Sequence, residues 1–410
     1  MHYRHLLCAQ AHQLIGPGDV DLPALRRILL ALVGTRQEPD LTSLDERDWA
    51  VINGLAGQHR LKPLLHAQNG VNPAVPSGLR RHWQETHRMA ALKAMLARQE
   101  LIECAGLLEA AGFSPIALKG AWLAHHAYPA PALRPMRDLD LLVPSAQILE
   151  SYAALLAAGF SELEPSKKPL PAVVRLYKHM PVLVAPRGSL VELHHRLWEP
   201  DGRLDHATPV QDEAALRVRA VSDKDGIRYL SPADTLAHLI IHAVYSHRLD
   251  CGPLLLADID FLLQTAPIDW AQFWARAVNE GWRGGARLVL ELVATYRSGA
   301  NIDFRHDQGK PTPTEVLAAA PDLLLQELDT RRSAALAAAV LSSGPKKLLQ
   351  RLRERRSAHG EAEVTQAMDH DSGMLGWGGS RIWRSVTELT RSDVRRQSRQ
   401  LAALSQWLDQ

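Results

Sequence analysis

Two aspartates stand one residue apart in the segment RDLDLLV, at positions Asp138 and Asp140. The segment is short and apolar, and Pro144 follows it, which predicts a β-strand. Alternate residues of a strand point to the same face, so the two carboxylates should project together. Carboxylates held side by side repel each other unless a cation neutralises them, and oxygen ligands of this kind suit Mg²⁺. The spacing therefore allows a metal site, although charges on an exposed strand edge would produce the same pattern.

A second pair with the same spacing, Asp258 and Asp260, lies in ADIDFLL at 257–263. The surrounding sequence has helical periodicity. At about 100° per residue, the two side chains would lie roughly 200° apart around the helix axis. They cannot converge on one ion, so we expect this pair to be solvated helix charges or helix caps.

The sequence around the first pair adds two further features. The segment SPIALKG before it is short, apolar and ends in Gly120, as a buried strand that turns into a helix would. Backbone N–H groups at such a turn, and at the start of the helix that follows, can bind a phosphate. After the pair, SLVELHHRLW is predicted to be another strand, in which Glu192 and His194 share a face. The chain thus presents a glycine turn, an Asp-x-Asp strand and a third acid on a later strand.

This ordered set resembles the nucleotidyltransferase superfamily that includes DNA polymerase β. It is most similar to the bacterial group of uncharacterised nucleotidyltransferase proteins. The matching segments are LKGAWLAHHAY, LRPMRDLDLLVP and VELHHRLW, and more loosely the helical HLIIHAVYSHRLDCGPLLLADIDFLL. The resemblance covers about residues 110 to 270.

The resemblance implies that Asp138, Asp140 and Glu192 are the catalytic residues and hold Mg²⁺, with Mn²⁺ as an alternative ion. It implies transfer of a nucleotidyl group from an NTP, expected to be ATP, to an acceptor hydroxyl or phosphate. The acceptor stays open among small molecules, sugars, peptides and proteins. Glu192 or Asp140 would accept the proton of the acceptor. The residues implied in nucleotide binding are Lys119, Gly120, Ala121, Arg134 and His194.

The glycine turn departs from the superfamily pattern, because Ala121 stands where Ser or Gly usually follows the glycine. Ala121 has no hydroxyl, so we expect Lys119 to supply the phosphate contact; the alternative is a lysine held by solvent at the strand edge. The Pro-rich loop before the acidic strand contains Arg134, which should be free to reach a phosphate. Arg137 directly precedes Asp138 and should face away from both aspartates, as a surface or backbone-pairing arginine.

The elements around these residues predict an α+β protein that is predominantly helical. Residues 1–112 contain helical patterns, of which 78–112 is the longest. Residues 113–230 alternate short strands and helices, and the strands of 180–198 flank an Arg-Gly pair as in a β-hairpin. Residues 231–410 return to helical periodicity. We therefore expect a small mixed-sheet nucleotidyltransferase core between helical N-terminal and C-terminal regions.

The composition excludes several classes of protein. A formal charge of +2 and 22% charged residues give no strong field that would select nucleic acid or a membrane surface. No apolar run approaches about 20 residues, so no membrane-spanning helix is expected. The N-terminus lacks the apolar core of a signal peptide, and the cysteines lack metal or disulfide spacing, which favours a reducing, cytoplasmic location. The three cysteines, expected to be buried thiols, are Cys8, Cys104 and Cys251.

His238 and His242 are four residues apart on a predicted helix, the spacing of one class of zinc hydrolase. That class needs a glutamate after the first histidine, and Leu239 stands there, so zinc hydrolysis is not expected. Helix packing and contact with the edge of a nucleotide are the alternatives for this pair. Near the C-terminus, four arginines are expected to form a solvated helix face rather than a nucleic-acid site. They are Arg391, Arg395, Arg396 and Arg399.

Two other functions stay open from the sequence. A catalytically weak binding or regulatory protein could keep the same fold; the three acids argue against it, and Ala121 argues for it. An enzyme that acts on nucleic acid as a polymerase does is a third hypothesis, which the balanced charge disfavours.

Overall fold

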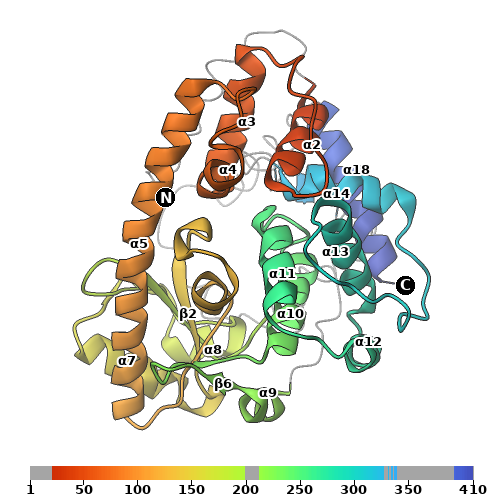
Figure 1. Cartoon of the computed structure of the whole chain (residues 1–410). Helices are drawn as coiled ribbons and strands as arrows, with labels where there is room; N and C mark the ends of the chain where they lie inside the picture. The colour runs from red at the N-terminus through yellow and green to blue at the C-terminus, as the bar shows by residue number, and fades with distance from the viewer. Residues whose placement is uncertain are drawn as a thin grey trace, which may run out of the picture.

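The computed structural model describes residues 21–198 and 212–326, the positions 331, 334, 335, 337 and 338, and residues 392–409. Within these residues the predicted α+β class is confirmed: helices surround one seven-stranded mixed sheet (Figure 1). None of the described helices is both long and apolar enough to cross a bilayer.

Among the described residues, four helices precede the first strand, and the last of them is the long helix predicted over 78–112. This helix, α5, runs along one side of the molecule from the other N-terminal helices to the strands (Figure 1). The four are α2 (Leu22–Val33), α3 (Glu46–Gln58), α4 (Lys62–Asn69) and α5 (Ser77–Ala110).

The sheet has the strand order β3-β4-β5-β2-β1-β7-β6. Its centre is the parallel pair β2 and β5, and β1 lies antiparallel to β2 on the other side. The strands are β1 (Ile116–Ala117), β2 (Asp138–Leu142), β3 (Ser161–Glu162), β4 (Leu183–Val184), β5 (Leu190–His194), β6 (Val221–Ser222) and β7 (Arg228–Tyr229). The segments between them include α6 (Gly120–Trp122), the π-helical turn η1 (Leu123–Ala127), the 3-10 turns η2 (Pro131–Leu133) and η3 (Ser145–Gln147), α7 (Ile148–Ala157), α8 (Leu170–Leu176) and α9 (Glu213–Arg219).

Strand alternation separates the two faces of β2 as the sequence predicts. Leu139 and Leu141 are fully buried in the core, whereas Asp138 and Asp140 alternate with them and point to the opposite face. The register pairs Asp140 with Glu192 of β5. Side chains at paired positions of neighbouring strands share a face, so the sheet itself brings the second and third acids together.

The hairpin predicted over 180–198 is confirmed as β4 and β5, paired antiparallel. Its turn uses Gly188 at φ +100°, a backbone conformation that side chains other than glycine rarely adopt. The buried carboxylate of Glu100 on α5 accepts hydrogen bonds from the backbone N–H groups of Arg187 (2.6 Å) and Ser189 (3.0 Å). Helix α5 therefore fixes the turn that sets the register of β5.

Among the described residues after the sheet, the regular elements are helices. α10 continues directly into the π-helical turn η4, and such turns occur frequently at functional sites. The elements are α10 (Pro232–Ile241), η4 (His242–Ser246), α11 (Leu254–Thr265), α12 (Trp270–Asn279), α13 (Arg283–Tyr296), α14 (Thr314–Leu324) and α18 (Ser392–Leu408).

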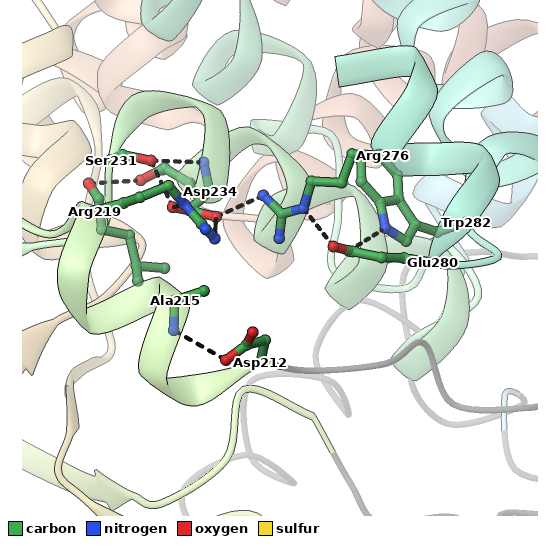
Figure 2. A network of polar contacts seen from close by, with 10 residues as sticks. Asp212, Ala215, Arg219, Ser231, Asp234, Arg276, Glu280 and Trp282 are labelled. Atoms are coloured by element: carbon green, nitrogen blue, oxygen red, sulfur yellow. Dashed lines mark hydrogen bonds and ion pairs between the residues drawn. The ribbon is translucent and has the colours of Figure 1, made fainter. Parts of the chain in front are cut away.

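A buried carboxylate joins three of these helices (Figure 2). Asp234, in the first turn of α10, accepts two hydrogen bonds from Arg219 at the end of α9, both at 2.8 Å. It also accepts one from Arg276 of α12 at 2.6 Å and one from the hydroxyl of Ser231, which caps α10. This network fixes the start of α10 where the chain leaves β7.

Candidate functional site

Three side chains converge on one face of the central strand pair. One ligand atom from each of Asp140, Glu192 and His194 lies within 4.8 Å of the other two. Asp138 precedes Asp140 on the same face of β2, is half-buried, and lies outside this group of three. Its burial, followed by the negative charges of Asp140 and Glu192, raises the pKa of Asp138 to about 6. The three carboxylates of this face therefore act on one another.

His194 lies between the two inner carboxylates. Its Nε2 is 3.0 Å from Oδ1 of Asp140 and 3.3 Å from Oε2 of Glu192, and its Nδ1 is 3.3 Å from the carbonyl oxygen of Arg196. Burial opposes a charge on this ring, but the adjoining carboxylates outweigh it and raise the pKa of His194. Because His194 has no exposed surface, its contacts orient the acids; the nucleotide contact implied by the resemblance stays a prediction.

Lys119 neutralises the innermost acid. Its Nζ lies 3.1 Å from Oδ2 of Asp140. Burial alone would raise the pKa of Asp140, but the charges of Lys119 and His194 hold that pKa well below its usual value. The backbone of Lys119 is in the left-handed region at φ 42°, an arrangement that costs about 1–3 kcal/mol and that concentrates at functional sites. A strained turn therefore aims this lysine at Asp140.

The glycine turn is closed by a neighbouring arginine. A Cβ on Gly120 would overlap Nη1 of Arg134 and lie 3.1 Å from Cγ of Met136. The adjacent N–H of Ala121 already donates to the carbonyl of Leu118 at 3.2 Å. Gly120 is thus required for the close approach of Arg134, and the phosphate contacts of Gly120 and Ala121 stay predictions.

Replacing Gly120 by alanine should destabilise the protein by about 1–3 kcal/mol, the usual cost of forcing extra atoms into a packed site. The new methyl group would push Arg134 out of position. The free energy of unfolding in urea measures the effect. Gly106→Ala is the matched control, because nothing lies within 4 Å of a Cβ at this helix position and alanine favours helix. Equal stability of Gly120→Ala and wild type would contradict the placement of Arg134.

Arg134 itself is held by the second aspartate pair. Its Nε and Nη2 donate to the two oxygens of Asp258 at 3.1 and 3.0 Å, and only 12% of its side chain is exposed. The hydroxyl of Tyr128 donates to the same carboxylate at 2.7 Å. Arg134 is therefore paired rather than free as its loop position suggested, and its contact with a phosphate stays a prediction.

The expectation that Asp258 and Asp260 are solvated charges or caps is wrong. They lie on helix α11 as predicted and point in different directions, but only 3% and 1% of them are exposed. Asp260 accepts a hydrogen bond from Nε of Arg297 at 2.8 Å, while Asp258 binds Arg134. Each aspartate can be buried because an arginine from another segment pairs with it. Helical periodicity depends only on neighbouring residues, so it could not predict these arginines.

His238 and His242 lie within range of the charge of Lys119. Their ring centroids are 6.0 Å apart on α10 and at the start of η4. Burial first, and then the positive charge of Lys119, hold the pKa of each well below its usual value, so both rings are neutral. Within the described residues, both ring nitrogens of His238 are buried without a hydrogen-bond partner. Both alternatives, packing and nucleotide contact, therefore remain for this pair.

Arg60 acts on the acidic site, and no sequence pattern predicts this role. Arg60 lies between α3 and α4, far upstream of the strands, and its charge lowers the otherwise raised pKa of Asp138. It donates from Nη1 to the carbonyl of Pro135, in the loop before β2, at 2.8 Å. Only the spatial approach of the N-terminal helices reveals it.

The remaining predictions concern residues away from the acids. Cys104 is buried and Cys251 half-buried, both as free thiols, while Cys8 lies outside the described residues. The solvated arginine face is confirmed for the part that α18 carries, where Arg395, Arg396 and Arg399 are exposed, and Arg391 lies outside the described residues.

The donors at the acidic face fit a divalent cation. The carboxylates of Asp140 and Glu192 offer oxygen atoms on neighbouring strands, and Asp138 lies two residues before Asp140 on the same strand face. Hard oxygen donors with excess negative charge are the chemistry that Mg²⁺ and Mn²⁺ bind. The observation in this structure that supports the fit is the convergence of ligand atoms from Asp140, Glu192 and His194 within 4.8 Å of one another.

Comparison with known proteins gives one family. A model of the uncharacterised nucleotidyltransferase family matches residues 45–298, from the N-cap of α3 to the residues just after α13. Neither a curated protein nor a solved structure gives a match. The family model covers more than half of the chain and includes all the acids described above, so the protein belongs to the uncharacterised nucleotidyltransferase family.

Proposed function

We propose that this protein transfers a nucleotidyl group from an NTP to an acceptor, with Mg²⁺ or Mn²⁺ bound by Asp138, Asp140 and Glu192. Family membership supports nucleotidyl transfer. The observation that carries the metal site is the register of the parallel strands, which sets Asp140 directly opposite Glu192. This arrangement also supports placement in the superfamily of DNA polymerase β. ATP is the proposed donor, and the acceptor is a small molecule, sugar, peptide or protein.

The contacts of the acids assign them different tasks. When bound, the metal ions lower the pKa of the attacking hydroxyl and neutralise charge on the leaving pyrophosphate. Both oxygens of Asp140 are engaged, one by His194 and one by Lys119. Glu192 keeps 21% of its side chain exposed. Of the two proposed proton acceptors, Glu192 is therefore the better placed to take the proton of the acceptor hydroxyl.

Lys119 has a proposed second position. In this structure the positive charge of Lys119 neutralises the carboxylate of Asp140. A metal ion on the carboxylates would supply that positive charge instead. The flexible four-carbon stem of lysine then allows Nζ to turn toward a phosphate oxygen of the donor. This is the phosphate contact expected for Lys119 from the sequence.

Replacing Asp138 by asparagine should lower turnover by a factor on the order of 10² to 10³, because charge stabilisation at such sites contributes several kcal/mol. The assay incubates the protein with Mg²⁺, each NTP and a cell extract, and detects added nucleotide by mass spectrometry. A chelator should abolish the product. Asp269→Asn is the matched control, since this exposed residue caps α12 and asparagine caps equally well. Full activity of Asp138→Asn, or turnover without divalent metal, would reject the proposed site.

A catalytically weak binding or regulatory protein is the second candidate. The observation that favours it is Ala121, whose N–H is engaged by Leu118 and whose side chain offers no hydroxyl. Such a protein would bind NTP in calorimetry but release no pyrophosphate with any extract. Release of pyrophosphate by the wild type, and its loss in Asp138→Asn, would exclude this candidate.

A further inference from the structure

Two arginines cross-link the α3–α4 turn to the loop that precedes β2. Arg60 donates from Nη1 to the carbonyl of Pro135 at 2.8 Å, and Arg137 donates from Nη2 to the carbonyl of Gln58 at 3.5 Å. Each arginine thus reaches into the segment that carries the other. The two side chains must run past one another, which places two guanidinium groups in one small region.

Three arginines gather in this region, and their positive charges act on one another. Burial, and then the charges of Arg137 and Arg134, lower the pKa of Arg60 to about 10. The same arginines act on His59: burial first, and then Arg137 and Arg60, lower its pKa to about 4. The charges of Asp138 and then Asp258 act on Arg60 in the opposite direction, and Asp258 is already bound by Arg134 through both oxygens. Like charges gathered in this way destabilise the free protein and favour an anion that joins them.

Arg60 also has an unused donor and a strained backbone. Among the described residues, no carboxylate lies within ion-pair distance of Arg60, and its Nε is buried without a hydrogen-bond partner. Its φ is +60°, in the left-handed region that glycine adopts without cost. A turn that favours glycine but carries a half-buried arginine indicates that the guanidinium itself is needed there.

The arginine pair lies beside the acids. Arg137 directly precedes Asp138, and the charge of Arg60 acts on the carboxyl group of Asp138. The family model begins at residue 45, so the α3–α4 turn with Arg60 is part of the matched region. A polyphosphate presents several oxygen atoms to donors, and the planar fork of arginine is suited to bind two of them at once.

We propose that Arg60 and Arg137 bind the β- and γ-phosphates of the donor NTP, next to the α-phosphate that faces Asp138. The inference rests on the proposed function for the identity of the donor. The polyphosphate site itself rests on the two crossed arginines.

Calorimetry with inorganic tripolyphosphate in excess Mg²⁺ tests the site without any transfer reaction. The wild type should bind, and Arg60→Gln and Arg137→Gln should each weaken binding by about tenfold to a hundredfold, the effect of one charge-assisted hydrogen bond. Arg60→Lys keeps the charge but loses the planar fork, so its affinity for tripolyphosphate should lie between those of the wild type and Arg60→Gln. Arg36→Gln is the matched control, because Arg36 is exposed and also donates to a backbone carbonyl, that of Ala294.

Arg137→Gln guards against misfolding, because Arg137 is exposed and glutamine keeps a side-chain N–H that can donate. Absence of tripolyphosphate binding by the wild type, or equal binding by the wild type and Arg137→Gln, overturns the inference. In the transfer assay the two glutamine variants should raise the KM for NTP by the same factor with kcat little changed. A fall in kcat with unchanged KM also overturns it. Tripolyphosphate binding that depends on both arginines, in a protein without transfer activity, rejects the proposed function and keeps the site.

Discussion

Replacement of Asp140 by asparagine should reduce nucleotidyl transfer at least about 10³-fold in kcat, measured as the initial rate of pyrophosphate release. Asparagine keeps the size of the side chain but loses the charge that a metal ion and the developing transition state require. Asp140 lies at the centre of the site: it faces Glu192 across the strands and is contacted by His194 and Lys119. No other described carboxylate has all three contacts.

The same substitution leaves the half-buried Lys119 and the buried His194 without their shared acid, so Asp140→Asn should also lower stability. A second variant separates the two effects. Asp140→Asn combined with Lys119→Met removes the lysine charge as well, and it should recover part of the lost stability without recovering transfer. Recovery of both stability and transfer would show that Asp140 serves only to balance Lys119.

Replacement of Asp258 by asparagine should destabilise the protein by about 3–5 kcal/mol, the cost of removing one partner from a buried ion pair. The change would leave the charge of Arg134 buried without an acid and weaken the bond from the hydroxyl of Tyr128. Urea unfolding followed by circular dichroism measures the shift of the midpoint.

Two further variants make the measurement specific. Asp303→Asn changes an acid whose partner, Arg305, is largely exposed, so its midpoint should move much less. Arg134→Met combined with Asp258→Leu replaces the buried pair by apolar side chains and should regain most of the stability. If Asp258→Asn unfolds at the same urea concentration as Asp303→Asn, the pair with Arg134 does not stabilise the fold.

Local periodicity accounts for what the sequence predicted well. The two-residue repeat of β2 placed Asp138 and Asp140 on one face, and the glycine in the Arg-Gly pair marked the hairpin that positions Glu192. The 3.6-residue repeat marked α5 and also showed that Asp258 and Asp260 diverge. These features depend only on neighbours along the chain.

Contacts between distant segments could not be predicted from local patterns in the sequence. The pairing of Lys119 with Asp140 depends on a left-handed backbone that nothing in the sequence LKGAW requires. Arg60 approaches Asp138 only because α3 and α4 fold back over the loop before β2. The burial of Asp258 depends on Arg134, more than a hundred residues away, so the pair looked like ordinary surface charges.

The ion pair between Arg134 and Asp258 makes the acidic strands depend on a helix outside the strand-bearing region. The loop before β2 receives Asp258 from α11 on one side and Arg60 from the α3–α4 turn on the other. A fragment of residues 113–230, which holds all the described strands, would lack both and would bury an uncompensated arginine. The acidic strand pair therefore does not form a complete site by itself. A fragment that keeps the site has to include the helices that flank it, as the matched span 45–298 does.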